Sequence, residues 1–195
     1  VHQNFPGQFV HVAAALAVAG HQVVALGITG RNVPGVHYVR YEPVSPPAGG
    51  VVRSDLAAKL VRAEGCANAM LALQAQGFEP DVIVAHPGWG EALFCKDVWP
   101  QARLVVFAEF YYTVDGSDYA FDPEFQTDTP AARMRLRLKN TALLHALAAA
   151  DAAYAPTQWQ KSQVPPEFQH KVEVIFDGID TQLVKPAAGV RVRLN

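Results

Sequence analysis

The first 27 residues constrain the fold more than any other part of this chain of 195 residues. They read as the end of a strand, a Pro-Gly loop at 5–8, an amphipathic helix and, after Gly20-His21, a second apolar strand. A loop that turns a strand into a helix directs backbone N–H groups and the positive end of the helix dipole beyond the sheet. Ligands of open α/β sheets bind at that edge. The segment therefore predicts half of a β-α-β unit and places a site beside it.

Apolar runs mark the other strands. The runs at 82–85 and 103–108 are continuous, which is typical of strands covered on both faces. Shorter segments predict strands at 36–41, 151–156 and 172–176.

Helical patterns lie between these strands. One is expected over 54–76, a short one near 91–97, and the strongest over 131–150. Ser54 is a plausible N-cap, and one side of its helix is traced by Leu56, Leu60, Ala67, Leu71 and Gln74. Parallel strands joined by helices predict an α/β fold, a Rossmann-like doubly wound parallel sheet in a single domain.

The composition and net charge of the chain limit the kinds of protein and partner that are expected. Half of the residues are hydrophobic and 17% are charged, so a sizeable core is expected. The net charge of −2 argues against nucleic acid as the main partner. Apolar stretches such as 9–19 and 141–150 are too short to span a bilayer. Cys66 and Cys95 are expected to be reduced thiols, because disulfides are rare in a chain of this kind.

The sequence lacks the motifs of several protein classes that are built on such sheets. The first loop carries only Gly7 and the second strand ends in Gly27 with no carboxylate, which argues against a dinucleotide-binding unit. No Walker A loop and no Gly-x-Ser-x-Gly elbow occur. The histidines are scattered, so a zinc site has no support.

Five segments, in order, carry a resemblance to a known family. HQNFPGQFVHVAAALAVAGHQV resembles the first β-α-β unit of family-four-like glycosyltransferases. The likeness continues in PDVIVAHPGWGEAL, FAEFYYTVDGSDYAFDPEF, RLKNTALLHALAAADAAYAPTQWQ and KVEVIFDGIDTQLVKP. Such enzymes have the GT-B architecture, in which two Rossmann-like domains face each other across a cleft. The resemblance covers nearly the whole chain.

The resemblance implies that residues 1–184 form the N-terminal, acceptor-side domain and that 185–195 begin a linker to a C-terminal domain. In the family, that second domain holds the nucleotide-sugar pocket and a paired-glutamate motif, which does not follow Pro186 here. The implied activity is retaining transfer of a hexosyl group from a UDP-, GDP- or ADP-sugar to a glycan, lipid or small-molecule acceptor. The isolated domain is expected to bind no cofactor of its own and to be inactive. The alternative is a non-catalytic sugar-binding or interaction domain.

The expected partners follow from the same resemblance. They are the C-terminal GT-B domain of the same polypeptide and a sugar or glycan acceptor, without nucleic acid. We expect a cytoplasmic location and leave open a peripheral association with the inner face of the membrane and a dimer.

His86 and Glu109 are the candidate catalytic residues. His86 ends one strand and precedes Pro-Gly-Trp-Gly, and Glu109 follows the next apolar run, so both are expected at the same edge. An imidazole there could hydrogen-bond a sugar hydroxyl, and a carboxylate suits capture of two hydroxyls. The resemblance implies that many relatives have a histidine at the position of Glu109. The structural alternatives are a strand-end cap for His86, with Trp89 packed in the core, and an ion pair with a nearby arginine for Glu109.

The candidate cleft-lining residues come from the first loop, the loop after His86 and the long loop 109–125. They are His2, Phe5, Gly7, Gln8, Trp89, Tyr111, Tyr112 and Asp115. Gly7 either lets a ligand approach the backbone or only forms the turn. His2 either lines the same pocket or is a buried structural histidine. The long loop interleaves aromatics and acids, which fits carbohydrate binding, although Phe121 and Phe125 favour a loop anchored by its own rings. Asp115, Asp118 and Asp122 lack the spacing of a Ca²⁺ loop, and no metal is expected.

Three further features concern the last third of the chain. The basic run from Arg133 to Lys139 places Arg135 and Lys139 nearly opposite Arg133 and Arg137. Solvated side chains are favoured for it, and the alternative is that one pair faces a phosphate, the partner domain or Glu109. Asn140 falls on an apolar stripe and is expected to hold the aromatic loop in place. Thr157 is expected to cap a helix.

Overall fold

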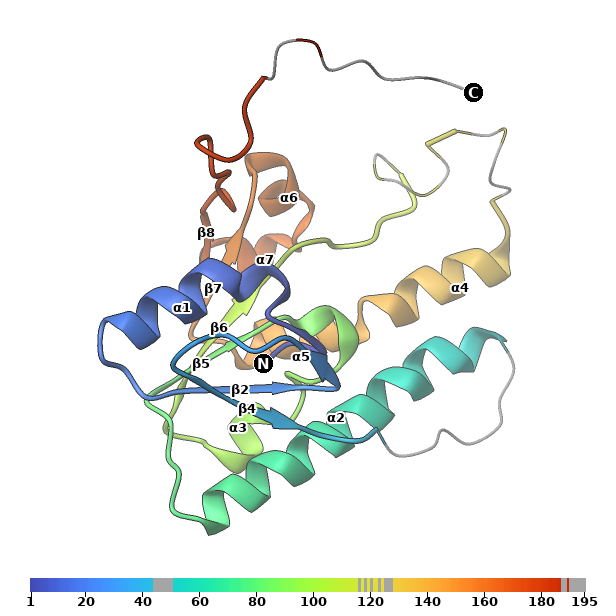
Figure 1. The fold of residues 1–195 in the computed structure, drawn as a ribbon. Coiled ribbons are helices and arrows are strands. Elements are labelled where there is room, and N and C mark those ends of the chain that lie inside the picture. Colours follow the sequence, from blue (N-terminus) through green and yellow to red (C-terminus); the bar gives the residue numbers. More distant parts are fainter. Residues whose placement is uncertain are drawn as a thin grey trace.

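The fold is described from a computed structural model of the chain, for residues 1–43, 51–115, 117, 119, 121, 122, 124, 128–186 and 189. Strands and helices alternate along it (Figure 1). The strands are β1 (Asn4–Phe5), β2 (Val23–Gly27), β3 (Thr29–Gly30), β4 (Val36–Arg40), β5 (Val82–Ala85), β6 (Arg103–Phe107), β7 (Ala152–Ala155) and β8 (Val172–Val174).

Two short 3₁₀ helices and seven α-helices connect the strands of the described part. They are η1 (Gly7–Phe9), α1 (Val10–Val18), α2 (Val51–Ala75), η2 (Pro87–Trp89), α3 (Cys95–Val98), α4 (Pro130–Lys139), α5 (Thr141–Ala149), α6 (Gln158–Gln163) and α7 (Pro166–Gln169). Among these residues, no helix combines the length and the apolar character that crossing a membrane requires.

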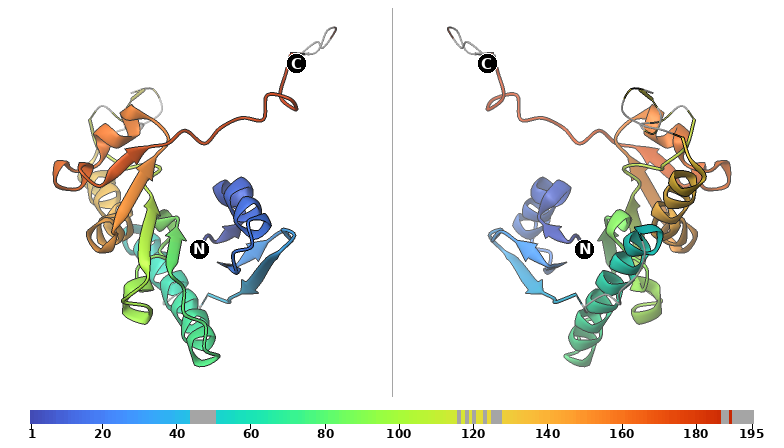
Figure 2. Two further views of the ribbon diagram at one scale, coloured as in Figure 1. Left: turned by 90° about the vertical axis from the view of Figure 1, so that its left-hand side faces the viewer. Right: turned by 90° about the vertical axis from the view of Figure 1, so that its right-hand side faces the viewer.

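All strand pairs are parallel, which confirms the α/β, Rossmann-like class. The described strands form three separate sheets instead of one continuous sheet: β1 with β3, β2 with β4, and β5-β6-β7-β8. Figure 2 shows β2, β4 and α1 standing apart from the four-stranded sheet. The carboxyl ends of β5 and β6 nevertheless meet at one edge, as the sequence predicts.

The main core fills the space between the four-stranded sheet and the helices α2, α3 and α5. Leu104 and Val106 of β6 are fully buried in it, as is Leu147 of α5. Cys66 and Cys95 are buried, free thiols, which confirms the prediction of reduced cysteines. A smaller cluster of Phe5, Ala13, Ala25 and Val33 packs α1 onto β2.

Helix α2 differs from its predicted form. It begins at Val51, so Ser54 lies inside the helix and the N-cap prediction is wrong. Leu60 and Leu71 are exposed, and the buried side carries Val61, Ala63, Cys66, Met70 and Leu73. The helix packs closely at Gly65, where an added Cβ would lie 2.6 Å from the carbonyl oxygen of Glu42.

The predicted helix over 131–150 is divided into α4 and α5 at Asn140. Asn140 caps α4 with its own backbone N–H, which donates to the carbonyl oxygens of Leu136 and Leu138. Its side chain forms hydrogen bonds with the backbone of Tyr112. The Thr157 cap is confirmed, because its Oγ1 accepts a hydrogen bond from the backbone N–H of Gln160 at 3.2 Å.

Candidate functional site

The candidate site lies where β5 and β6 end. His86 follows β5 directly, and Glu109 lies two residues after β6. Because the two strands are parallel neighbours, their ends bring the side chains together. Nε2 of His86 is 2.9 Å from Oε2 of Glu109. The two residues that the sequence selected as catalytic candidates thus contact each other directly.

The backbone fixes the orientation of His86. The N–H of Gly88, in the first turn of η2, donates to Nδ1 of His86 at 3.2 Å. A nitrogen that accepts from an amide carries no proton, so the ring proton is on Nε2. Nε2–H of His86 therefore donates to the Glu109 carboxylate. His86 does cap the strand end, as the structural alternative held, and it orients Glu109 as well.

A second histidine reaches the same carboxylate through Gln8. Nδ1 of His2 accepts from the backbone N–H of Asn4 at 3.0 Å, which leaves the proton on Nε2. That nitrogen donates to Oε1 of Gln8 at 2.8 Å, and Nε2 of Gln8 donates to Oε1 of Glu109 at 3.3 Å. Each Glu109 oxygen therefore accepts one hydrogen bond. The His2 and His86 rings pack edge to face, with centroids 5.2 Å apart.

The charges in this network follow from burial and hydrogen bonding. The hydrogen bond from His86 is the main cause of a lowered pKa at Glu109, so its carboxyl group stays ionised. Burial, followed by the neighbouring His86, lowers the pKa of His2 to about 4. His2 is consequently neutral near pH 7. The result is one carboxylate that accepts a hydrogen bond from the buried His86 ring and is linked to the buried His2 ring through Gln8.

Gly7 makes room for His2. Its φ is +47°, a left-handed conformation that side chains with a Cβ adopt rarely. A Cβ on this residue would lie 2.5 Å from Cε1 of the His2 ring. The close approach that requires a glycine here is made by His2, within the protein. Gly7 thus supports the network from the loop that opens the chain.

A cavity of about 280 Å³ lies beside the pair. Its lining includes His86, Glu109 and four aromatic residues, Trp89, Phe107, Phe110 and Tyr112. The side chain of Glu109 is 43% exposed and that of His86 only 6%, so the carboxylate is the more accessible group. Trp89 is 42% exposed, with its ring nearly parallel to that of His86 at 6.3 Å. Trp89 is therefore at the surface of the cavity and not in the core.

Basic residues also line this cavity. Sequence reasoning selected neither Lys59 nor Arg62, both from α2. Arg62 lies over the Trp89 ring at 5.8 Å, and burial lowers the pKa of Lys59 to about 8. Basic residues three apart on one helix face are a signal that could have found them. Arg135 and Lys139 of α4 line the same cavity.

The basic residues of α4 have different partners on the two sides of the helix. Arg135 pairs with Asp55 at 2.8 Å, and Nζ of Lys139 lies 4.4 Å from the centre of the Tyr112 ring. Arg133 instead pairs with Asp128 away from the cavity. The predicted separation of the two sides of α4 is confirmed. Arg133, Arg135 and Arg137 are exposed, as the prediction of solvated side chains held, and Arg135 and Lys139 also line the cavity.

Asn140 anchors the long loop, as predicted. Its Oδ1 accepts from the backbone N–H of Tyr112 at 2.9 Å, and its Nδ2 donates to the Tyr112 carbonyl oxygen at 2.7 Å. The side chain is 4% exposed, so both bonds are shielded from solvent. On the other side, Nε2 of Gln160 donates to the Glu109 carbonyl oxygen at 2.8 Å. The start of the loop is thereby held at both Glu109 and Tyr112.

Of the eight predicted lining residues, Trp89 and Tyr112 line this cavity and the other six do not. His2, Gly7 and Gln8 belong to the network that supports Glu109, and the remaining three lie elsewhere. Phe5 is buried and stacks on Tyr38 with ring centres 5.8 Å apart, and Tyr111 packs against the main core. Asp115 is exposed, and its carbonyl oxygen accepts a hydrogen bond from Thr113.

The outer loop is only partly described. Phe121 is 85% exposed, so the expectation that it anchors the loop is wrong. Asp118 and Phe125 lie outside the described residues. Within the described part of the chain, no group of three or more His, Cys, Asp or Glu side chains could hold a metal ion.

Comparison with known proteins gives one family. A family model described as "Glycosyl transferase family 4 group" matches residues 19–184. No curated protein matches the chain significantly. The matched range begins after α1 and includes both His86 and Glu109.

Proposed function

The chain belongs to the glycosyl transferase family 4 group, and we propose that it forms the acceptor side of an enzyme that moves a hexosyl group from a nucleotide sugar to an acceptor. The observation that carries the proposal is the ionised, accessible Glu109 carboxylate held by His86 beside an aromatic-lined cavity. Ligands of parallel sheets bind at this edge.

Glu109 is the group that would contact the sugar. Its side chain is far more exposed than that of His86, and each of its oxygens retains acceptor capacity for a hydroxyl. A fixed negative charge also stabilises the positive charge that develops on a sugar ring during transfer. His86 acts through Glu109 as a positioning residue, because its one ring proton already points at the carboxylate.

Trp89 provides a surface for the acceptor. Its half-exposed ring stands beside the carboxylate, and the apolar C–H face of a sugar packs well on such a ring. Arg62, over the ring and bonded to the Trp89 carbonyl oxygen at 3.3 Å, holds it in place. Lys139 and Arg62 add positive charge, which favours an acceptor with an acidic or phosphorylated part.

The donor site is proposed to lie in a second, C-terminal domain of the same polypeptide. The intact enzyme would then be tested with UDP-, GDP- and ADP-glucose, with nucleotide release and sugar transfer as readouts. We expect one nucleotide class to support both. If none of the three is bound or consumed while the protein still binds glycans, the domain is a non-catalytic sugar-binding module and the proposal fails.

A further inference from the structure

The cavity beside Glu109 carries an excess of positive charge. Its basic lining residues are Lys59, Arg62, Arg135 and Lys139, and its acidic ones are Asp55 and Glu109. Four positive and two negative formal charges leave a net charge of +2, whereas the whole chain has a net charge of −2. A cavity with this excess attracts anions.

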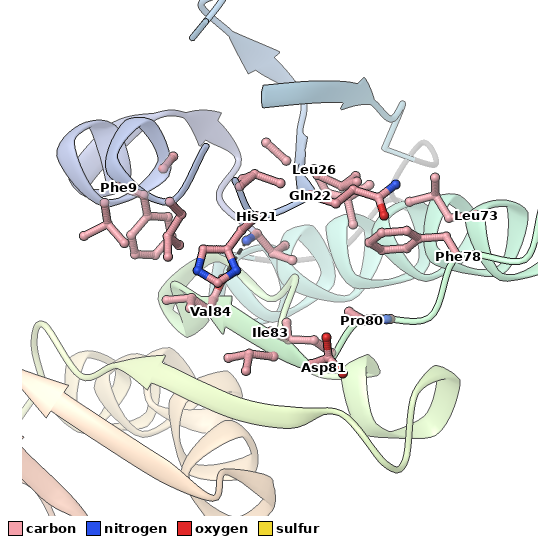
Figure 3. A pocket seen from close by; sticks show the side chains of 18 of the residues that line it. Phe9, His21, Gln22, Leu26, Leu73, Phe78, Pro80, Asp81, Ile83 and Val84 are labelled. Carbon is pink, nitrogen blue, oxygen red and sulfur yellow. Dashed lines mark hydrogen bonds between the residues drawn. The ribbon is translucent and has the colours of Figure 1, made fainter. Parts of the chain in front are cut away.

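A larger cavity, of about 410 Å³, has a different lining (Figure 3). It lies between β2 and β5, and Figure 3 shows Asp81 among mainly apolar side chains. None of the described residues that line it is a lysine or an arginine. Of these two cavities, the smaller one beside Glu109 is thus the one that can attract an anion.

Three of the four cations in the smaller cavity lack a carboxylate partner. Arg135 is paired with Asp55 at 2.8 Å. Within the described part of the chain, no carboxylate oxygen lies within ion-pair distance of Lys59, Arg62 or Lys139. These three positive charges are therefore available to a ligand.

Lys59 is the most buried of the three cations. It is 8% exposed, and its Nζ donates to the carbonyl oxygen of Lys139. Burial is the main cause that lowers the pKa of Lys59 to about 8, and the like charges of Lys139 and Arg62 contribute, while Asp55 opposes them. The cations thus act on one another. An anion among them would reduce both their repulsion and the cost of burying a charge.

The other two cations keep donors for a ligand. Nη1 of Arg62 donates to the carbonyl oxygens of Ala58 and Trp89 at 3.3 Å each, and the structure shows no hydrogen bond from its other guanidinium nitrogens to a described residue. Nζ of Lys139 lies 4.4 Å from the centre of the Tyr112 ring. A guanidinium with free N–H groups and an ammonium together suit the oxygens of a phosphate group.

Glu109 does not neutralise these cations. Its two oxygens accept from His86 and Gln8, and among the described residues no lysine or arginine nitrogen lies within ion-pair distance of them. One cavity therefore offers a carboxylate for hydroxyl groups and separate positive charges for an anion. A ligand that carries hydroxyls and an anionic group on one small molecule matches both.

The net charge of the cavity favours a phosphate over a carboxylate. A phosphate monoester carries a charge of about −1.5 to −2 at pH 7, which balances the +2 of the lining, whereas a sugar carboxylate brings a single negative charge. The cavity volume of about 280 Å³ is near the lower end of the range for small-molecule sites, about 300 to 1,000 Å³. The space therefore suits one small ligand.

We propose that the acceptor is a small sugar phosphate, whose phosphate monoester is bound by Lys59, Arg62 and Lys139 while a hydroxyl of the same molecule contacts Glu109. This inference rests on the proposed transferase function, because it names the class of acceptor. It assigns Lys59, Arg62 and Lys139 to acceptor specificity.

The test measures the binding of four probes to this chain by isothermal titration calorimetry: glucose 6-phosphate, glucuronate, glucose and inorganic phosphate. We expect glucose 6-phosphate to bind about tenfold more tightly than glucuronate or glucose. Inorganic phosphate should bind more weakly than glucose 6-phosphate, because it lacks the sugar hydroxyls. Equal affinity for glucuronate and glucose 6-phosphate would overturn the proposal, as would failure of both phosphates to bind. Inorganic phosphate that binds as tightly as glucose 6-phosphate would overturn it too, because the site would then hold a free ion.

Substitutions on α4 locate the phosphate. Lys139→Met should weaken the binding of glucose 6-phosphate about tenfold, and Lys139→Arg should keep most of the affinity. Arg137→Met removes the same charge from the same helix at an exposed position outside the cavity, so it is the matched control and should bind normally. Equal affinities of the Lys139→Met and Arg137→Met proteins, with unchanged melting temperatures, would overturn the proposal.

Glu109→Gln separates this inference from the transferase proposal. Because it removes a negative charge from the cavity, it should tighten the binding of inorganic phosphate. If the intact enzyme binds glucose 6-phosphate through Lys139 but consumes no nucleotide sugar, the transferase proposal fails and the phosphate site stands. If it transfers a sugar to an acceptor without phosphate, and Lys139→Met leaves that rate unchanged, the present inference fails and the transferase proposal stands.

Discussion

Nε2 of His86 lies 2.9 Å from Oε2 of Glu109, and this contact joins the ends of β5 and β6 at the edge of a cavity. The other oxygen of the same carboxylate accepts from Gln8, which in turn accepts from His2. Residues from three distant parts of the sequence thereby hold one negative charge in a fixed place. A charge positioned before the reaction stabilises a transition state without reorganisation cost.

Removing His86 should change the pH dependence of the enzyme. The His86 hydrogen bond is the main cause of the lowered pKa of Glu109, so His86→Ala should raise that pKa. The acid limb of kcat/KM in the intact enzyme would then move to higher pH, because the carboxylate protonates sooner. An acid limb that stays in place, with lower turnover at every pH, would mean that His86 supports the fold only.

His2 should make the folded chain sensitive to acid. Burial lowers its pKa from 6.5 to about 4, so the unfolded chain takes up the proton first. The stabilising contribution is complete above pH 6.5 and is lost as the pH falls toward 4, by about 3 kcal/mol in total. Urea unfolding between pH 4.5 and 7.5 measures it. His2→Gln should flatten this slope, whereas His11→Gln, an exposed site on α1, should leave it unchanged.

Gly90 should tolerate no side chain. Its φ is +111°, and a Cβ would lie 2.2 Å from the carbonyl oxygen of Lys59 in α2. Gly20 has a φ of +87° with nothing within 4 Å of its Cβ position, so it is a matched control for backbone strain alone. Gly20→Ala should cost about 1 kcal/mol of unfolding free energy, and Gly90→Ala about 2 kcal/mol more because of the clash. Equal losses, measured by urea unfolding, would show that the loop relaxes away from α2.

Asn140 should control the order of the long loop. Asn140→Leu removes both hydrogen bonds to the Tyr112 backbone, at a cost of about 2 kcal/mol. Asn140→Asp keeps the acceptor for the Tyr112 N–H and should lose less. Hydrogen exchange at the Tyr112 amide should be fastest in the leucine variant and intermediate in the aspartate variant. Identical exchange in all three proteins would contradict the anchoring role.

The sequence was sufficient to predict that His86 and Glu109 lie at the same edge, because each follows an apolar run and parallel strands end at one edge. It did not predict the link from His2 through Gln8, since His2 and Gln8 meet Glu109 only after the loop at 5–8 folds back. The cations of α2 were missed because its alanine-rich pattern does not fix which side is buried. The division at Asn140 was missed because leucines flank it on both sides, and the decisive partner, the Tyr112 backbone, is distant in sequence.

The most direct test of the central claim is the turnover of the intact enzyme carrying Glu109→Gln. The amide keeps the size of the side chain and removes the charge, so kcat/KM should fall about 100-fold, as when other positioned electrostatic groups are removed. The melting temperature should change little, because the residue is half exposed. Glu64→Gln, at an exposed position of α2, is the matched control and should keep full activity. Full activity of the Glu109→Gln enzyme would contradict the assignment of this edge as the acceptor site.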